Sequence, residues 1–164
     1  AGLLATKTEL RDGRPAGAAA DEKKPPAAPD PKKPFDYEQA IQPESESPES
    51  VPGALLRVTL DREHWLTAGL DDEIQVVVDG TRVFTPIKLD RGRNVGIYAK
   101  KDRLVAGGFA WPTSQDLLAQ KAYLIDQPLG RGHVIAFAED PTFRGIAEAS
   151  ALLLLNAVVL GPSR

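Results

Sequence analysis

Residues 130–145 read GRGHVIAFAEDPTFRG, and this stretch gives the clearest indication of the fold. Glycines turn the chain at its start, and the apolar run at 133–139 predicts a β-strand that is covered on both faces, as central strands are. The strand ends at Glu139 and Asp140, and Arg144 follows shortly afterwards. Carboxylates at the end of a buried strand often belong to the ligand-binding or catalytic site of an α/β protein, so this junction is the first candidate site.

Further strands are expected on both sides of this stretch. Apolar runs predict strands, in chain order, at 54–60, 74–79, 81–87, 94–100, 103–110, 121–129 and 133–139. Asp79 and Gly80 form a turn dipeptide between the second and third of these strands, which favours a hairpin. The mixture of strands and helices predicts an α/β or α+β layer fold.

Two helices are predicted, at 113–120 and at 143–161. The first begins after a proline, with Thr113 or Ser114 as its N-cap. The second is rich in apolar residues near helical spacing, namely Leu152, Leu153, Leu155, Val158 and Val159. We therefore expect this closing helix to pack on the sheet and to end at the glycine and proline that follow it.

Residues 14–52 differ in kind from the rest of the chain. They hold nine of the fourteen prolines, in runs such as AAADEKKPPAAPDPKKP, and few apolar side chains. Proline removes backbone hydrogen-bond donors, and the few apolar side chains would bury too little surface to offset the conformational entropy lost on ordering. We therefore expect a disordered insertion. Residues 1–13 are interpreted as the end of a truncated fold element, and residues 53–164 as the globular domain.

Composition excludes several classes of function. The formal net charge of −3 gives no electrostatic case for nucleic acid, and no apolar run is long enough to span a bilayer, so neither nucleic acid nor a membrane is expected as a partner. The absence of cysteine excludes thiolate nucleophiles, thiolate zinc sites and disulfides. The chain also lacks methionine and shows no signal peptide, so we expect a processed product or a piece of a longer protein.

Three pieces of the sequence resemble one protein family. They are PGALLRVTLDREHWLTAGL at 52–70, the stretch 104–145 with its WPTSQDLL, GRGHVIAF and DPTFRG segments, and LLLNAVVLGP at 153–162. In this order they are similar to the C-terminal domain of many bacterial zinc carboxypeptidases of the carboxypeptidase A/T type, which has a class I glutamine-amidotransferase-like fold. The resemblance covers about two-thirds of the chain. Two features depart from the family pattern. Trp65 stands where the family usually has proline, and the proline-rich stretch is unusually long.

This resemblance implies a partial flavodoxin-like, doubly wound sheet that is closed by the C-terminal helix and lacks its first βα units. It also implies that zinc and the catalytic residues belong to an upstream peptidase domain, and that the protein is secreted or periplasmic. The expected partner is that upstream domain or the missing N-terminal half of the fold. A truncated sheet exposes an edge strand, so a homodimer is a further expectation.

Neither family chemistry finds its residues in this chain. A glutaminase needs a cysteine nucleophile with a histidine close to a carboxylate after the last central strand, and Glu139 has no imidazole beside it. A zinc carboxypeptidase needs an H-x-x-E pair, which neither His64 nor His133 begins. None of the six serines lies in a G-x-S-x-G elbow. We therefore expect no catalysis, no metal site and no cofactor in this chain alone.

The remaining candidates for a binding site are Glu139, Asp140, Arg144, Trp111 and His64. The first three would form a polar rim at the end of the strand, and Trp111 would offer an aromatic platform at the end of another. His64 would be a surface contact. A position in the core is the alternative for Trp111.

The other candidates also have structural alternatives. Asp140 would cap the helix that starts nearby, and Glu139 would pair with Arg144. His64 would satisfy backbone groups of the residues that follow it. His133, which opens a strand after a glycine turn, is expected to be solvated.

Three functions remain open at this point. The leading hypothesis is a non-catalytic accessory region of an exported zinc carboxypeptidase-like protein. The second is a glycan- or peptide-binding module that uses Glu139, Arg144 and Trp111. The third is a hydrolase or transferase whose active site is completed by upstream residues, with Glu139 contributing to it.

Overall fold

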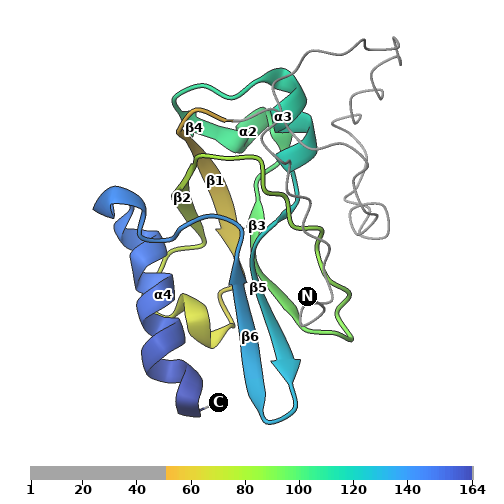
Figure 1. Ribbon diagram of the computed structural model, residues 1–164, viewed down its shortest axis with the longest axis vertical. Helices are drawn as coiled ribbons and strands as arrows, with labels where there is room; N and C mark the ends of the chain where they lie inside the picture. Colours follow the sequence, from red (N-terminus) through yellow and green to blue (C-terminus); the bar gives the residue numbers. More distant parts are fainter. Residues whose placement is uncertain (1–50, 164) are drawn as a thin grey trace.

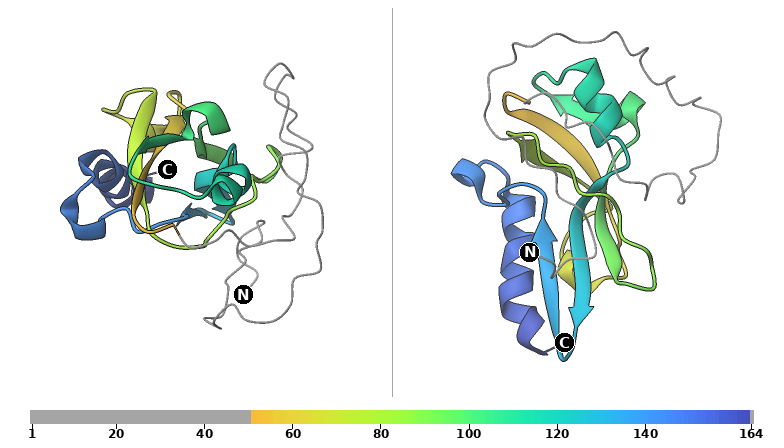
Figure 2. Two further views of the ribbon diagram at one scale, coloured as in Figure 1. Left: turned by 90° about the horizontal axis from the view of Figure 1, so that it is seen from above. Right: turned by 45° about the vertical axis from the view of Figure 1, so that its right-hand side comes forward.

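The computed structural model describes residues 51–163 of the chain. Its strands form one curled sheet, and strand β1 (Ala54–Leu60) lies inside this sheet (Figure 1, Figure 2). It pairs on one side with β2 (Glu73–Val78). On its other side it pairs with β3 (Arg93–Tyr98) and, towards its beginning, with the short β4 (Val105–Gly107). The strands predicted around 54–60, 74–79 and 94–100 are thereby confirmed.

Strands β5 (Ala122–Leu129) and β6 (Gly132–Phe137) extend the sheet beyond β3 as a hairpin. Every strand pairing within residues 51–163 is antiparallel. The predicted α/β class with a closing C-terminal helix is confirmed. The flavodoxin-like arrangement is not confirmed, because such a sheet is built from parallel strands.

Burial along the strands shows that β5, rather than β6, is the covered strand of the hairpin. The first five residues of β5 are all buried, from Ala122 to Asp126. Strand β6 lies at the end of the sheet, and Val134, Ile135 and Phe137 are only partly buried. The predicted central position of this strand is therefore wrong. A short apolar run does not distinguish a central strand from an end strand whose two faces are each partly covered.

Two of the predicted strands are replaced by other structure. Residues 81–87 form no strand and contribute a single bridge between Phe84 and Ala122, so the predicted hairpin at Asp79-Gly80 is wrong. The apolar side chains of this segment are nevertheless buried, so burial alone explains the pattern that suggested a strand. The strand predicted at 103–110 is largely wrong. Its first two residues belong to the one-turn helix α2 (Lys101–Leu104), which buries Leu104, and only the three residues of β4 form a strand.

Helix α3 (Pro112–Leu118) confirms the first predicted helix, but not its cap. The N-cap residue is Trp111, and no side chain caps the helix there, so the predicted caps Thr113 and Ser114 are wrong. The helix begins earlier because proline suits the first helical position, where its missing N–H costs no hydrogen bond.

The closing helix α4 (Glu148–Leu160) begins later than the predicted start of 143–161. A separate 3₁₀ turn, η2 (Phe143–Gly145), precedes it. Arg144 at φ 50° and Gly145 at φ 65° are both left-handed, and this conformation interrupts the helix. The short turn η3 (Gly161–Ser163) follows α4, in agreement with the predicted end.

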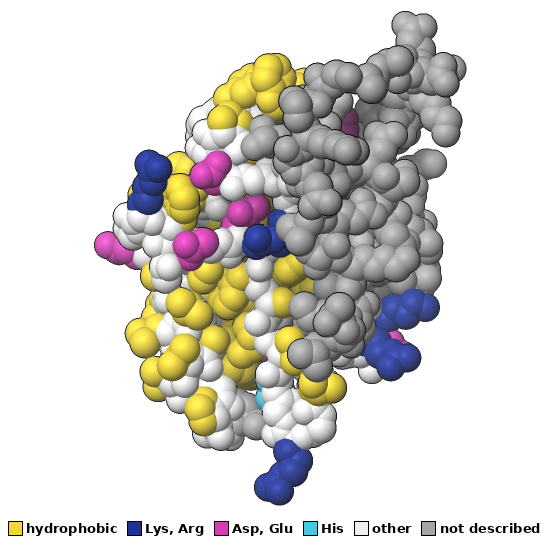
Figure 3. Space-filling model, viewed as in Figure 1, with side chains coloured by type: hydrophobic (Ala, Val, Ile, Leu, Met, Phe, Trp, Pro, Cys, Tyr) yellow, Lys and Arg dark blue, Asp and Glu magenta, His cyan; other side chains and the backbone are white. Residues whose placement is uncertain are grey.

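The apolar face expected on α4 is mostly exposed. The residues that the helix buries are Ser150, Leu153 and Asn156, which are spaced three apart. More than half of the surface is exposed at Leu155, Val158 and Val159. Hydrophobic side chains gather on this part of the surface (Figure 3). The predicted packing on the sheet is therefore confirmed for Leu153 and wrong for these three residues.

The curl of the sheet brings together the carboxyl ends of its two end strands. Strands β2 and β6 are the first and last in the sheet order, and the alternation of antiparallel pairs makes them run in the same direction. Just beyond their ends, Arg82 Nη1 donates a hydrogen bond to the Ala138 carbonyl over 2.9 Å. This contact joins segments that are 56 residues apart and sets the position of the candidate site.

Candidate functional site

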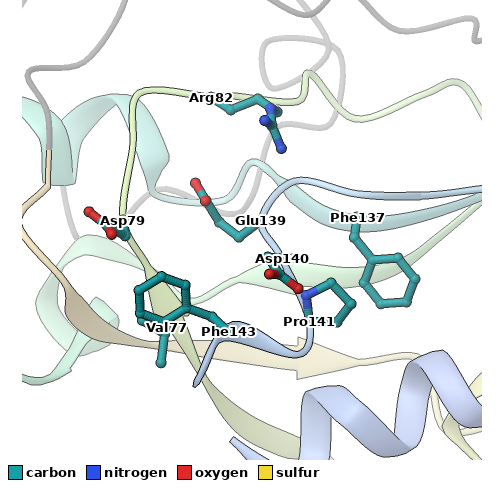
Figure 4. Close-up of a pocket in the computed structure, with 8 residues that line it drawn as sticks. All are labelled: Val77, Asp79, Arg82, Phe137, Glu139, Asp140, Pro141 and Phe143. Carbon is teal, nitrogen blue, oxygen red and sulfur yellow. The ribbon is translucent and has the colours of Figure 1, made fainter. Parts of the chain in front are cut away.

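A pocket of about 410 Å³ lies where the ends of β2 and β6 meet (Figure 4). Its walls come from β2, from the loop after β2, and from the junction between β6 and η2. The lining residues are Val77, Asp79, Arg82, Phe137, Glu139, Asp140, Pro141 and Phe143. The pocket therefore contains the junction that the sequence singled out, together with a second segment that it did not connect to that junction.

Glu139 is the most unusual group in this pocket. The residue is only 9% exposed, and its Oε1 atom has no hydrogen-bond partner among residues 51–163. Burial raises the pKa of its carboxyl to about 7, although the positive charge of Arg82 and the backbone N–H of Asp79 act in the opposite direction. Near neutral pH this carboxyl is thus divided between its two protonation states.

The surroundings of Glu139 hold it close to the backbone of the β2 end. A Cβ atom added at Gly80 would lie 3.6 Å from Oε1 and 3.7 Å from Oε2. Figure 4 shows the carboxylate between Asp79 and Arg82. The Arg82 guanidinium donates a hydrogen bond to the Ala138 carbonyl. Its effect on Glu139 is that of a nearby positive charge, which lowers the pKa of the carboxyl.

The predicted pairing of Glu139 with Arg144 is wrong. Within the described region no ion pair joins them, and the cation that influences Glu139 is Arg82. The Arg144 guanidinium instead lies over the ring of Phe143, with 5.1 Å between its Cζ atom and the ring centroid. Arg144 therefore flanks the pocket through a lining residue and is not itself part of the lining.

The predicted helix cap at Asp140 is wrong, because the N-cap residues are Thr142 for η2 and Ala147 for α4, and no side chain caps either one. Asp140 instead stabilises the turn before η2. Its Oδ1 accepts hydrogen bonds from the backbone N–H and the hydroxyl of Thr142, each over 2.8 Å. The backbone hydrogen bond, followed by the hydroxyl, holds the pKa of the Asp140 carboxyl below its usual value. A side chain fixed in this way contributes a permanent negative charge to the pocket rim.

Trp111 lies away from the pocket, at the beginning of α3. It is 46% exposed, and its ring meets that of Phe109 edge to face with 4.8 Å between the centroids. The alternative position in the core is therefore wrong. Phe109 is itself 53% exposed, so the two rings form an aromatic surface that is separate from the lining of the pocket.

His64 also lies outside the pocket, and its structural alternative is confirmed. It is the N-cap of the 3₁₀ turn η1 (Trp65–Thr67), and its Nδ1 accepts a hydrogen bond from the Leu66 N–H over 3.3 Å. Because Nδ1 is an acceptor, the proton of the neutral ring is on Nε2. That nitrogen lies 3.1 Å from Oδ2 of Asp126, to which it donates.

Asp126 joins His64 to the second histidine of the chain. The Nδ1 atom of His133 lies 2.9 Å from Asp126 Oδ1. His133 is exposed, as the sequence predicted, although its side chain is bound to Asp126 and is only 24% exposed. Burial alone would raise the pKa of Asp126, which is 3% exposed, but the hydrogen bonds from the two imidazoles outweigh it and lower the pKa. Each imidazole binds a different carboxylate oxygen, so the cluster is satisfied internally.

No group of three or more histidine, aspartate or glutamate side chains within residues 51–163 is arranged to hold a metal ion. In the same part of the chain no helix is both long enough and apolar enough to cross a membrane.

Comparisons with known proteins do not identify the chain. No protein-family model matches it, and searches of curated proteins and of solved structures give no significant match.

Proposed function

We propose that residues 51–163 form a non-catalytic accessory domain that binds a ligand in the pocket around Glu139. The observation that carries this proposal is the buried Oε1 atom of Glu139, which lacks a partner among the described residues and lines a cavity. A buried polar atom without a hydrogen bond is destabilising by roughly 1 to 3 kcal/mol, and by more when the group is charged. Such a cost is typical of a group that is kept for function.

The size and composition of the pocket support a binding role. Ligand sites in proteins have volumes of roughly 300 to 1,000 Å³ and combine apolar walls with a few polar groups. The pocket of about 410 Å³ has aromatic and aliphatic walls together with Asp79, Arg82, Glu139 and Asp140. Its lining includes no serine, threonine, cysteine, lysine or histidine, so covalent catalysis through these usual nucleophiles is not supported.

A catalytic contribution by Glu139 is the second candidate. A carboxyl with a pKa of about 7 can exchange a proton near neutral pH, as a general acid or base must. In this version the domain completes the active site of a hydrolase or transferase whose other residues lie elsewhere in the protein.

The resemblance to carboxypeptidase-associated domains supports a particular parent protein. On that basis we propose an exported, secreted or periplasmic zinc carboxypeptidase-like protein in which this domain packs on the peptidase domain. An amidotransferase-like, partly flavodoxin-like origin of the fold belongs to the same proposal. An H-x-x-E motif in the sequence directly upstream of Ala1 would support this parent, and a different upstream domain would contradict it.

Ligand binding is tested with the full chain and a library of small fragments and short peptides. Binding is followed in two-dimensional NMR spectra through the amide resonances of residues 137–140, 142 and 143, since residue 141 is proline and has no amide proton. We expect at least one ligand to shift these resonances and to lose affinity in Glu139→Gln. Glu63→Gln, which changes an exposed carboxylate in a surface turn, is the matched control. Fragments that bind only at other surfaces would contradict the proposal, whereas turnover of peptide substrates that is lost in Glu139→Gln would favour the catalytic candidate.

A further inference from the structure

We propose that the pocket recognises a primary ammonium group on an apolar stem, such as the side chain of a lysine residue in a peptide, and that Glu139 Oε1 accepts a hydrogen bond from this ammonium. The inference rests on the proposed binding function and specifies the chemical class of the ligand. It follows from the charge of the pocket, from the nature of its walls and from the one carboxylate oxygen that has no partner in the described region.

The charge of the lining favours a cation. Three carboxylates, those of Asp79, Glu139 and Asp140, face one guanidinium, that of Arg82. Arg82 already donates to the Ala138 carbonyl, which leaves it less available to an anionic ligand. An anion in this pocket would therefore lie beside three negative groups, whereas a cation would reduce their mutual repulsion.

Glu139 is the carboxylate best suited to contact this cation. Asp140 uses Oδ1 to hold Thr142, so part of its hydrogen-bonding capacity is committed to the chain. Glu139 Oε1 is buried and unpaired among residues 51–163. A neutral donor would supply a hydrogen bond but would leave the buried charge uncompensated. An ammonium group supplies both the hydrogen bond and the opposite charge.

The walls of the pocket fit the stem of such a ligand. Val77, Phe137, Pro141 and Phe143 provide apolar surface next to the carboxylates. A chain of methylene groups can lie along this surface while the charged end reaches Glu139, in the manner of lysine side chains that bury their stems. The ring of Phe143 contacts the Arg144 guanidinium at 5.1 Å from outside the pocket lining, which is an example of a cation on this ring.

Protonation provides a signature of this contact. The ionisable groups that act on Glu139 are Asp79, just after β2, and Arg82 from the following loop. Glu139 in turn acts on Tyr98 of β3 and Tyr123 of β5. Burial keeps the pKa of both tyrosines above the usual value, so they remain neutral. Since the pKa of Glu139 is about 7, an ammonium ligand selects the ionised carboxylate and releases a proton when it binds at pH 6.

The test uses the full chain and three uncharged-backbone probes that differ only in their side chain. They are the Nα-acetyl N-methylamides of lysine, norleucine and glutamate, and binding is measured by calorimetry and by NMR shifts of residues 137–143. We expect the lysine probe to bind at least tenfold more tightly than the other two. Its affinity should fall roughly tenfold between pH 8 and pH 6, because Glu139 becomes protonated while the lysine side chain stays charged.

Variants separate this inference from the broader proposal. Glu139→Gln should reduce the affinity of the lysine probe at least tenfold and abolish its pH dependence, whereas Glu63→Gln should leave both unchanged. If norleucine or glutamate binds at these residues as tightly as lysine, the ammonium inference is overturned while the ligand-binding function stands. If none of the three probes shifts these resonances, the inference is likewise overturned, and the fragment library then decides the binding function alone.

Discussion

The carboxyl of Glu139 makes the stability of the fold depend on pH in an unusual direction. In the unfolded chain this group loses its proton near its ordinary pKa of 4.5, whereas in the folded chain it holds the proton until about pH 7. Between these values the folded state binds more protons, so its stability falls as the pH rises. This difference in pKa corresponds to a loss of about 3 kcal/mol in the free energy of unfolding as the pH rises from 4.5 to 7.

Glu139→Gln removes this titration. We expect the free energy of unfolding of the wild-type chain to fall, relative to that of the variant, by about 3 kcal/mol between pH 4.5 and pH 8. Urea unfolding at a series of pH values measures this difference. The exposed Glu63→Gln variant should run parallel to the wild type over the same range. A constant difference between wild type and Glu139→Gln would show that the carboxyl is not desolvated.

Asp126 behaves in the opposite way, because its pKa is lowered. Its contribution to stability is present above the unfolded value of 3.8 and is lost as the pH falls through the lower pKa of the folded state. Asp126→Asn should therefore lower the free energy of unfolding at pH 7 by about 3 kcal/mol, as for other broken buried pairs. The difference should shrink below about pH 4.

Asp116→Asn is the matched control for Asp126. Asp116 pairs with Lys101, but its side chain is 38% exposed, so the cost of this change should stay below about 1 kcal/mol. Equal losses of stability in the two variants, measured by urea unfolding at pH 7, would argue against a special role for the histidine-bound carboxylate.

Tyr98 provides a test at a second unpartnered atom. Its hydroxyl is buried and has no hydrogen-bond partner among residues 51–163, so its removal leaves no other group unsatisfied. Tyr98→Phe should leave the free energy of unfolding unchanged or raise it by up to about 1 kcal/mol. Tyr123→Phe, which loses a hydrogen bond to Ser150, should be destabilising by about 1 kcal/mol. A marked loss of stability in Tyr98→Phe, measured by thermal and urea unfolding, would reveal a partner for this hydroxyl.

At the scale of elements, polar side chains determine how α4 is held. Asn156 Nδ2 donates to the carbonyls of Leu66 and Ala68 over 2.8 and 2.9 Å, which ties the helix to η1. Six residues earlier, Ser150 donates to the Pro141 carbonyl over 2.6 Å. Leu153 lies between these two anchors and is fully buried. The helix is therefore placed by two hydrogen-bonding residues and one leucine, and not by a broad apolar stripe.

Asn156→Ala should release α4 from η1. The variant leaves two carbonyls without their donor, so we expect the free energy of unfolding to fall by about 2 kcal/mol. Val158→Ala, on the same helix but 65% exposed, should change it by less than about 0.5 kcal/mol. Urea unfolding compares the two, and hydrogen exchange of the α4 amides shows whether the loss is local to the helix. A larger effect at Val158 would mean that this surface is covered in solution.

The same elements show what the sequence could predict. Apolar runs were sufficient to predict β1 and β2, and a proline followed by a polar turn was sufficient to predict α3. Helix α4 was expected in the right part of the chain, but its start was placed at residue 143 and not at Glu148. Its exposed face was also misjudged, because a helix that is apolar nearly all round gives no indication of which side is covered. The central position predicted for β6 was wrong for a similar reason, because local periodicity carries no information about the order of strands in a sheet.

For the site, the sequence identified Glu139 and Asp140 but missed Arg82, Asp79 and Asp126. The first two missed residues follow β2 and meet the end of β6 only because the sheet curls, which no local pattern encodes. The Asp79-Gly80 dipeptide was a signal, but it was interpreted as a hairpin turn. Asp126 lies in an apolar strand, where a single buried carboxylate could have indicated a partner such as histidine.

At the scale of the whole molecule, the pocket exists only when both ends of the sheet are in place. A ligand that binds the folded state alone stabilises it by RT ln(1 + [L]/Kd), or about 2.7 kcal/mol at a ligand concentration one hundred times the Kd. The lysine probe should therefore raise the midpoint of thermal unfolding of the wild-type chain and have little effect on Glu139→Gln. Differential scanning calorimetry at pH 8 measures both. Equal stabilisation of the two proteins would place the binding elsewhere.

The curl of the sheet also has a consequence for the order of folding. The β5–β6 hairpin closes over a two-residue turn, whereas the meeting of the β2 and β6 ends requires a loop of more than fifty residues to close. Long loops close later than short ones, because more chain entropy is lost before any contact forms. We therefore expect the contact between the ends of β2 and β6, around Glu139, to form last when this domain folds and to open first when it unfolds. A nascent or partly unfolded chain would then have its hairpins but no binding site, so occupancy of the pocket would report that the domain is complete.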